Sequence, residues 1–224
     1  MTLLALLLLL VDPATTAPAI RGHDPWVFRC ALDRQPRMVV LAIAPGWWVA
    51  FDAARGSIYK AWEGEVEFTG TVYDTRHGPQ PRAIGETLFE SRPIRIVGED
   101  GNPAFDAQWQ WRGYRFVEGE VELSISCNAP DGREIVVVLS PRVLARDGRP
   151  VLRIVMKVRG LDDNERAEFA VCNMNAARIS RGRMGIVGEP VESAFAPFST
   201  TEDHVARIGR LSDPVVFDLE IADK

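Results

Sequence analysis

Histidine and cysteine are scarce in this chain of 224 residues, and their spacing excludes several kinds of site. The three histidines are His23, His77 and His204, and no two of them stand at the separation of a metal-ligand pair. No CxxC or CxxCH segment occurs, which excludes a zinc ribbon and the covalent attachment of a c-type haem. We therefore expect no metal site and no cofactor.

Motifs of nucleophilic catalysis and of phosphate binding are also missing. The chain has no GxSxG and no SxxK segment, and Ser180–Gly185 contains glycines but matches neither GxGxxG nor a P-loop. Oxygen ligands for calcium occur together at Glu99, Asp100 and Asn102, but no complete EF-hand pattern surrounds them. No motif in the chain demands a particular chemistry.

The chain lacks an excess of basic charge and a long apolar run. Its net charge is -5, whereas nucleic-acid binding needs a basic footprint, so we expect no nucleic-acid partner. No stretch reaches the ~20 apolar residues of a membrane-spanning helix, so we expect no integral membrane protein. The hydrophobic content of 46% is enough for a core of ordinary size.

The N-terminus has the pattern of a secretory signal. Leu3–Val11 is continuously apolar, too short to span a bilayer, and Ala17-Pro18-Ala19 then offers a small-x-small cleavage site. The segment before the apolar run has no Lys or Arg, and the alternative is a buried N-terminal strand or helix. We predict a signal peptide over residues 1–19, one domain over residues 20–224, and export to the periplasm or the extracellular space.

The three cysteines leave the disulfide pattern open. Cys30, Cys127 and Cys172 allow three pairings with one thiol left over, or they are three small buried apolar residues. Burial is the interpretation we favour for Cys127, because it is in phase with the apolar face of a predicted strand.

Short segments with strand patterns fill the first half of the chain. Met38–Ala44 is a continuous apolar run that Pro45-Gly46 turns into Trp47–Phe51, which is the pattern of a hairpin. Gly64 separates the next two predicted strands. The other predicted strands in this half are Ser57–Trp62, Glu65–Tyr73, Pro93–Val97 and Phe105–Phe116.

The second half continues the pattern. The clearest strand has one apolar and one polar face, and its apolar face is made by Val121, Leu123, Ile125 and Cys127. Ile135–Leu139 is apolar on both faces, which predicts a central strand. Another apolar face is formed by Leu152, Ile154, Met156 and Val158. Ala167–Cys172 is either a strand or one helical turn, and Val215–Ile221 is the final strand.

Many short strands with turn signals between them predict an all-β fold with few or no long helices. We expect an antiparallel β-sandwich, a large supersandwich-like one included, or an open barrel. Residues 160–224 are expected to complete the same sandwich, with Val187–Asp203 as a surface loop.

The segment Trp26–Pro81 is the densest in residues that could recognise a ligand. It holds four of the six tryptophans, with basic residues between them. Trp47 and Trp48 are adjacent in a predicted strand, so their side chains point to opposite faces, one toward the core. The other indole is either a stacking surface for a sugar ring or packed under a loop.

Several motifs in this region resemble a known family. They are, in order, Trp26-Val27-Phe28-Arg29, Leu32-Asp33, Pro36-Arg37-Met38, Trp48–Asp52, Tyr59–Gly64, His77–Pro81 and Trp111–Phe116. Over residues 24–160 the chain resembles the N-terminal non-haem β domain of extracytoplasmic c-type cytochrome proteins, which are predicted to be sugar-related oxidoreductases. The cytochrome part with its CxxCH is absent. The resemblance therefore implies a β module of such a system, standing alone, and a cytochrome-bearing oxidoreductase as its partner.

His77 is the strongest single candidate for function. It lies in a Pro-rich turn after Tyr73 and Asp74, where Pro79 and Pro81 restrict the backbone and could present the imidazole to a ligand. An imidazole there acts as a general base, a metal ligand or a hydrogen-bond donor, or it holds the turn by bonding backbone carbonyls.

Lys60 and Asp52 are candidates with a simpler alternative. They lie on neighbouring predicted strands, where a cross-strand ion pair of ~0.2–1 kcal/mol is the structural interpretation. The complete ligand-binding set that we predict is Trp48, Lys60, Trp62, Tyr73, His77 and Gln80.

Two functions follow from these residues. The first is an exported, non-catalytic module that binds carbohydrate or docks a partner oxidoreductase. The alternative is a small β-sandwich enzyme acting on a sugar, with His77 and a carboxylate, Asp74 or Asp52, as the acid and base. The first is preferred, because no motif demands chemistry.

Overall fold

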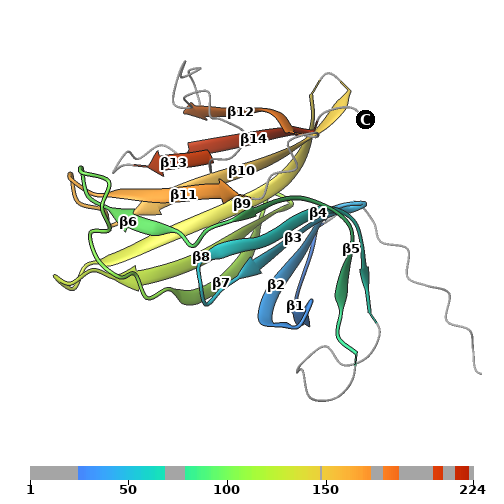
Figure 1. Ribbon diagram of the computed structural model, residues 1–224, viewed down its shortest axis with the longest axis horizontal. Coiled ribbons are helices and arrows are strands. Elements are labelled where there is room, and N and C mark those ends of the chain that lie inside the picture. Colours follow the sequence, from blue (N-terminus) through green and yellow to red (C-terminus); the bar gives the residue numbers. More distant parts are fainter. Residues whose placement is uncertain are drawn as a thin grey trace, which may run out of the picture.

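The chain folds as an antiparallel β-sandwich (Figure 1). The computed structural model describes residues 25–68, 79–146, 148–172, 179–186, 204–208 and 215–221. All regular secondary structure within these ranges is β-strand, so the predicted all-β fold is confirmed. Among these residues no helix is long and apolar enough to cross a membrane.

Two sheets make up the sandwich. The first contains, in order, β1 (Trp26–Leu32), β2 (Gln35–Ala44), β3 (Trp47–Asp52), β4 (Ser57–Glu67), β5 (Arg82–Ser91), β11 (Arg166–Cys172) and β13 (His204–Ile208), with β6 (Arg95–Val97) paired to β11. The second contains, in order, β12 (Ile179–Ile186), β14 (Val215–Ile221), β10 (Arg149–Arg159), β9 (Glu134–Arg146), β8 (Glu120–Asn128) and β7 (Gln110–Val117).

Strands from the C-terminal part of the chain belong to both sheets. β11 and β13 extend the first sheet, whereas β12 and β14 extend the second (Figure 1). The described strands after residue 160 therefore extend both sheets of the sandwich. Ala167–Cys172 is a strand and not a helical turn, and the final strand at Val215–Ile221 is confirmed. The predicted loop Val187–Asp203 lies outside the described residues.

The main core lies between the sheets and follows the predicted alternation. The four apolar residues predicted on β8, from Val121 to Cys127, are all buried in it, and so are the four predicted on β10, from Leu152 to Val158. Ile135–Leu139 lies on β9 between β8 and β10, which confirms the prediction of a central strand.

Two predicted strand boundaries are wrong. Gly64 does not end a strand, because β4 continues through it from Ser57 to Glu67. The strand predicted at Phe105–Phe116 begins only at Gln110, although Phe105 still packs against the core as its pattern suggested. In both cases the boundary is set by backbone hydrogen bonding between strands, which the pattern of apolar residues does not specify.

Gly64 continues β4 because it faces another glycine. Gly64 and Gly85 are cross-strand partners on β4 and β5, with φ of 145° and 127°. A Cβ on Gly64 would lie 2.1 Å from the carbonyl oxygen of Ile84, and one on Gly85 equally close to that of Glu63. Only glycine permits this approach, and paired glycines of this kind let a sheet bend sharply.

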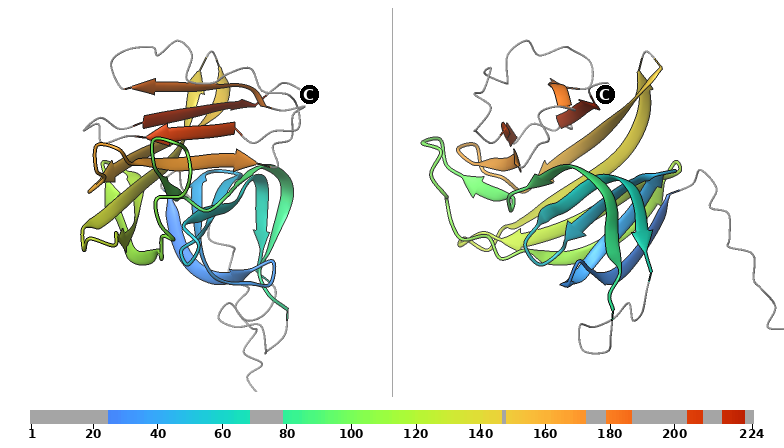
Figure 2. Two further views of the ribbon diagram at one scale, coloured as in Figure 1. Left: turned by 60° about the vertical axis from the view of Figure 1, so that its left-hand side comes forward. Right: turned by 45° about the vertical axis from the view of Figure 1, so that its right-hand side comes forward.

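The strands β1–β5 curve strongly (Figure 2). The turn after β1 contacts the start of β5, since the backbone N–H of Asp33 donates to the carbonyl of Pro81 over 3.0 Å. Phe28 of β1 also contacts Phe68, which follows β4, with ring centroids 5.3 Å apart. Contacts that reach across β2 and β3 require the face on which they lie to be concave. We call it the concave face; its opposite side packs against the second sheet.

Candidate functional site

The concave face carries a second hydrophobic cluster. Its buried members are Cys30, Leu32, Met38, Val40, Ala50 and Trp62, and further apolar residues, Phe28 and Trp48 among them, pack against it half-buried. Trp47 instead lies in the main core, so the two adjacent tryptophans point to opposite faces as predicted.

The register of the sheet brings three tryptophans into one row. Trp26, Ala42, Trp48 and Trp62 are successive cross-strand partners on β1 to β4. Cross-strand partners share a face of the sheet at a spacing of ~5 Å, so all three indoles belong to the concave face. We call Trp26, Phe28, Trp48, Trp62 and Phe68 the aromatic cluster.

Four rings of the aromatic cluster, those of Phe68, Phe28, Trp48 and Trp62, form a continuous series. Trp48 stacks on Trp62, with centroids 5.9 Å apart and planes 13° apart. Phe28 meets Trp48 edge-on at 6.4 Å and Phe68 at 5.3 Å. Offset-stacked and edge-to-face pairs of this kind stabilise by roughly 0.5–1.5 kcal/mol beyond their burial, so neighbouring rings hold each other in position.

Exposure rises along the series toward one end. Trp62 is fully buried and Trp48 is half-buried, whereas Phe68 is 53% exposed and Trp26 is 46% exposed. The exposed rings are therefore that of Phe68, which contacts Phe28, and that of Trp26, which lies in the same cross-strand row as Trp48 and Trp62.

The polar edges of the inner indoles are already used. The Nε1–H of Trp48 donates to the carbonyl of Gly64 over 2.9 Å, and that of Trp62 donates to the carbonyl of Glu65 over 3.0 Å. Both acceptors lie at the bend of β4, so these bonds fix the rings to the curved backbone. They also leave Trp48 and Trp62 no N–H with which to recognise a ligand.

A polar cluster centred on Asp33 also lies on the concave face. The Asp33 carboxylate accepts from Lys60 Nζ over 2.9 Å, from the backbone N–H of Ala83 over 2.9 Å, and from the Tyr59 hydroxyl over 3.4 Å. Tyr59 and Lys60 both reach it because Tyr59 is the extra residue of a β-bulge opposite β3.

The carboxylate of Asp33 also changes the titration of its neighbours. Burial, together with the negative charge of Asp33, raises the pKa of Tyr59 to about 12. The same two causes, burial first, raise the pKa of the Cys30 thiol to about 11. Neither group is ionised at neutral pH, so neither is prepared to act as a base or a nucleophile.

Lys60 does not bind Asp52, and this prediction was wrong. Lys60 pairs with Asp33, while Asp52 caps its own turn by accepting from the backbone N–H groups of Ala54 and Arg55 over 3.0 and 3.1 Å. The Arg55 guanidinium lies 3.7 Å from the second carboxylate oxygen of Asp52. Lys60 pairs with Ala50 on the face of Trp62, whereas Asp52 pairs with Ser57 on the far side of the bulge at Tyr59, which adds a residue between Lys60 and that pair.

The remaining predicted site residues divide into two groups. Gln80 is buried just before β5, beside the Pro81 that Asp33 holds. Tyr73, Asp74 and His77 lie outside the described residues, and their role stays a prediction. The structure thus brings Trp48 and Trp62 into contact with each other and places Lys60 in a separate polar cluster.

Sequence reasoning missed the role of four residues of the concave face. Trp26 and Phe28 alternate on one strand, which was a usable signal, but Phe68 reaches them only through the curl of the sheet. No local pattern in the sequence indicates the role of Asp33, because its hydrogen-bond partners are 26 to 50 residues away along the chain.

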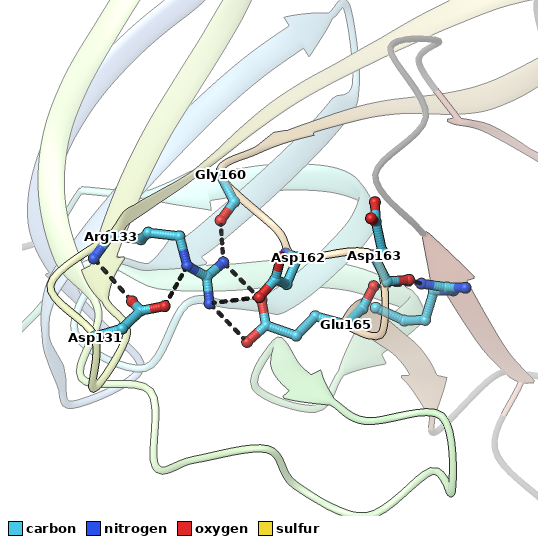
Figure 3. A network of polar contacts seen from close by, with 7 residues as sticks. Asp131, Arg133, Gly160, Asp162, Asp163 and Glu165 are labelled. Atoms are coloured by element: carbon cyan, nitrogen blue, oxygen red, sulfur yellow. Dashed lines mark hydrogen bonds and ion pairs between the residues drawn. The ribbon is translucent and has the colours of Figure 1, made fainter.

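A second polar cluster lies where the β8–β9 turn meets the connection between β10 and β11 (Figure 3). The Arg133 guanidinium donates to Asp131 over 2.6 Å, to the Gly160 carbonyl over 2.8 Å, and to both carboxylate oxygens of Glu165 over 3.0 and 3.2 Å. Asp162 lies 3.8 Å from it. This arginine joins the β8–β9 turn to the β10–β11 connection. Its carboxylate partners therefore have a structural role in this contact.

Groups of metal ligands are absent from the described part of the chain, where no three His, Cys, Asp or Glu side chains are placed to hold an ion. The three cysteines do not form disulfides in the structure; Cys30 and Cys127 are buried, as predicted for Cys127, and Cys172 is half-buried. No protein-family model, curated protein or solved structure matches this chain.

Proposed function

We propose that the protein is an exported, non-catalytic module that binds carbohydrate at the exposed end of the aromatic cluster. The observation that carries this proposal is the half-exposed ring of Phe68, which continues the series of contacting rings formed by Phe28, Trp48 and Trp62, together with the half-exposed Trp26 in the same cross-strand row. Large exposed aromatic side chains mark contact surfaces, and a ring face suits the apolar C–H face of a sugar.

The surroundings of these rings favour stacking over hydrogen-bond recognition. The indole N–H groups of Trp48 and Trp62 donate to backbone carbonyls. A ligand would therefore contact the ring faces and edges of Phe28, Phe68 and Trp26. Such a surface fits an extended neutral oligosaccharide better than a single charged sugar, because several sugar rings are needed to bury enough area.

The binding role is preferred over the enzymatic alternative because the described acid–base candidates are structurally occupied. Asp52 caps a turn and Lys60 is paired with Asp33. The enzymatic alternative therefore depends on His77 and Asp74. The proposal of a partner oxidoreductase is supported by the family resemblance alone. Export is supported by the apolar run Leu3–Val11 and the small residues that follow it.

A thermal-shift screen tests the binding proposal. The chain from Ile20 is incubated with β-1,4-linked hexasaccharides of glucose, xylose and N-acetylglucosamine. We expect one of them to raise Tm saturably, because a bound ligand adds RT ln(1 + [L]/Kd) to the unfolding free energy. Phe68→Ala should abolish this shift in Tm. Phe116→Ala is the matched control, because Phe116 is 55% exposed on another strand. A shift that survives Phe68→Ala and Trp26→Ala would refute the site.

Turnover and export are checked on the same material. Any hexasaccharide that binds is incubated with the protein and its products are separated; hydrolysis or oxidation lost in His77→Ala would favour the enzymatic alternative. Mass spectrometry of the full chain secreted by a bacterial host should give an N-terminus at Ile20. An uncleaved N-terminus retained in the cytoplasm would contradict export.

A further inference from the structure

β7 is the terminal strand of the six-stranded sheet in the part of the chain that the structure describes. A terminal strand presents backbone N–H and C=O groups that can accept a further strand. A β-bulge between Trp111 and Gly113 interrupts the first half of β7, so regular pairing is open to Gly113–Val117.

The core-facing side of β7 is covered at one end and bare at the other. Trp111 packs on Phe51 of the opposite sheet, with ring centroids 6.2 Å apart. Tyr114 and Phe116 point to the same side as their buried cross-strand partners Leu123 and Val121, yet they are 46% and 55% exposed. The first sheet does not extend over them. We call Tyr114 and Phe116 the β7 ledge.

The other side of β7 is basic. Arg112 and Arg115 are its only charged residues, although the whole protein has a net charge of -5. Arg115 binds Glu122 through Nε and Nη2, over 2.7 and 2.6 Å, and its side chain is still 72% exposed. Arg112 binds Glu134 through Nη2 alone over 2.7 Å. Both guanidinium groups keep N–H donors for a further carboxylate.

We propose that β7 docks an extended segment of a partner protein in which apolar residues alternate with Asp or Glu. The segment adds to Gly113–Val117 as a further strand, because alternate side chains of a strand point to opposite faces. Its apolar side chains cover the β7 ledge, and its carboxylates face Arg115 and Arg112. This surface is separate from the aromatic cluster, so the proposal stands or falls independently of carbohydrate binding.

Two fluorophore-labelled peptides test the docking. The first alternates Glu and Ile over ten residues, and the second has Lys in place of each Glu. We expect fluorescence anisotropy to show the Glu peptide binding the full chain at least tenfold more tightly than the Lys peptide. Amide hydrogen exchange should slow at Gly113–Val117 on binding. Equal affinities, no binding, or protection at another strand would overturn the proposal.

Substitutions separate this surface from general charge effects. Arg115→Glu is expected to reverse the preference between the peptides, and Phe116→Ser to weaken the Glu peptide at least tenfold. Arg55→Glu is the matched control, because Arg55 is 71% exposed and also paired with a carboxylate, that of Asp52. An equal loss in Arg55→Glu, or sedimentation showing that β7 instead joins two copies of the chain, would contradict a partner segment.

Discussion

The carboxylate of Asp33 accepts a hydrogen bond of 2.9 Å from the backbone N–H of Ala83, fifty residues further along the chain. Through this bond and its ion pair with Lys60, the turn after β1 holds the start of β5. The contact keeps the first sheet curled, and the curl in turn gathers the aromatic cluster on one face.

Removing the Asp33 side chain should therefore open this end of the concave face. Asp33→Ala leaves a largely buried ammonium and a backbone N–H without their acceptor, which costs about 1–3 kcal/mol of unfolding free energy. Asp33→Asn keeps an acceptor for Ala83 and should cost less. Urea denaturation measures both, and equal stability of Asp33→Ala and the wild type would contradict the account.

Gly64→Ala tests the bend of β4 and β5. The new Cβ would meet the carbonyl of Ile84 at 2.1 Å at a φ that L-residues avoid, so we expect a loss of about 2–4 kcal/mol. Gly46→Ala is the control: its φ is 74°, but nothing lies within 4 Å of a Cβ there, so only the backbone cost of roughly 1–2 kcal/mol applies. Similar losses for the two variants would show that the close approach does not matter.

Acid should weaken the second sheet through two carboxylates. Burial opposes ionisation of Glu122, but its hydrogen bonds and ion pairs with Arg115 and Lys157 outweigh that effect and hold its pKa below the usual range. A hydrogen bond from Arg133 is the main reason that the pKa of Glu165 is also lowered.

A pKa that is lower in the folded state than in the unfolded state stabilises the fold above the unfolded value of about 4.3 and ceases to do so as pH falls through the folded value. We expect the unfolding free energy to stay level from pH 7 to about pH 5 and to drop below about pH 4.3. The double variant Glu122→Gln, Glu165→Gln should show a shallower drop. An unchanged acid slope in this variant would count against these ion pairs.

The buried thiols should be nearly inert in the folded protein. Burial raises the pKa of Cys30 and of Cys127 to about 11, assisted by the charges of Asp33 and Glu165 respectively. At pH 8 such a thiol has far less thiolate than an ordinary cysteine, in addition to being inaccessible. Labelling with a disulfide reagent, followed by mass spectrometry, should modify both residues only in urea. Rapid labelling of Cys30 without urea would contradict its burial in the cluster on the concave face.

The fold class and the main core could be predicted because they depend on local patterns. The alternation around Val121–Cys127 places one face of β8 in the core whatever its partners are. The opposite directions of Trp47 and Trp48 follow equally from the geometry of a single strand.

The candidate site could not be predicted in the same way, because it depends on register and on curl. Lys60 meets Asp33, which lies 27 residues away in sequence, and a bulge at Tyr59 separates Lys60 from the Asp52–Ser57 pair. Phe68 joins Phe28 only because Gly64 and Gly85 let two strands bend together. No periodicity in the sequence encodes these long-range pairings.

Isothermal titration with the hexasaccharide that gives the largest thermal shift measures the affinity of the aromatic cluster for carbohydrate. We expect Phe68→Ala and Trp26→Ala each to weaken binding at least tenfold, and Phe116→Ala, which removes a ring of similar exposure on β7, to bind as the wild type does. Circular dichroism must show all three variants folded. Unchanged affinity in Phe68→Ala and Trp26→Ala, or equal loss in all three, would contradict a carbohydrate site on the aromatic cluster.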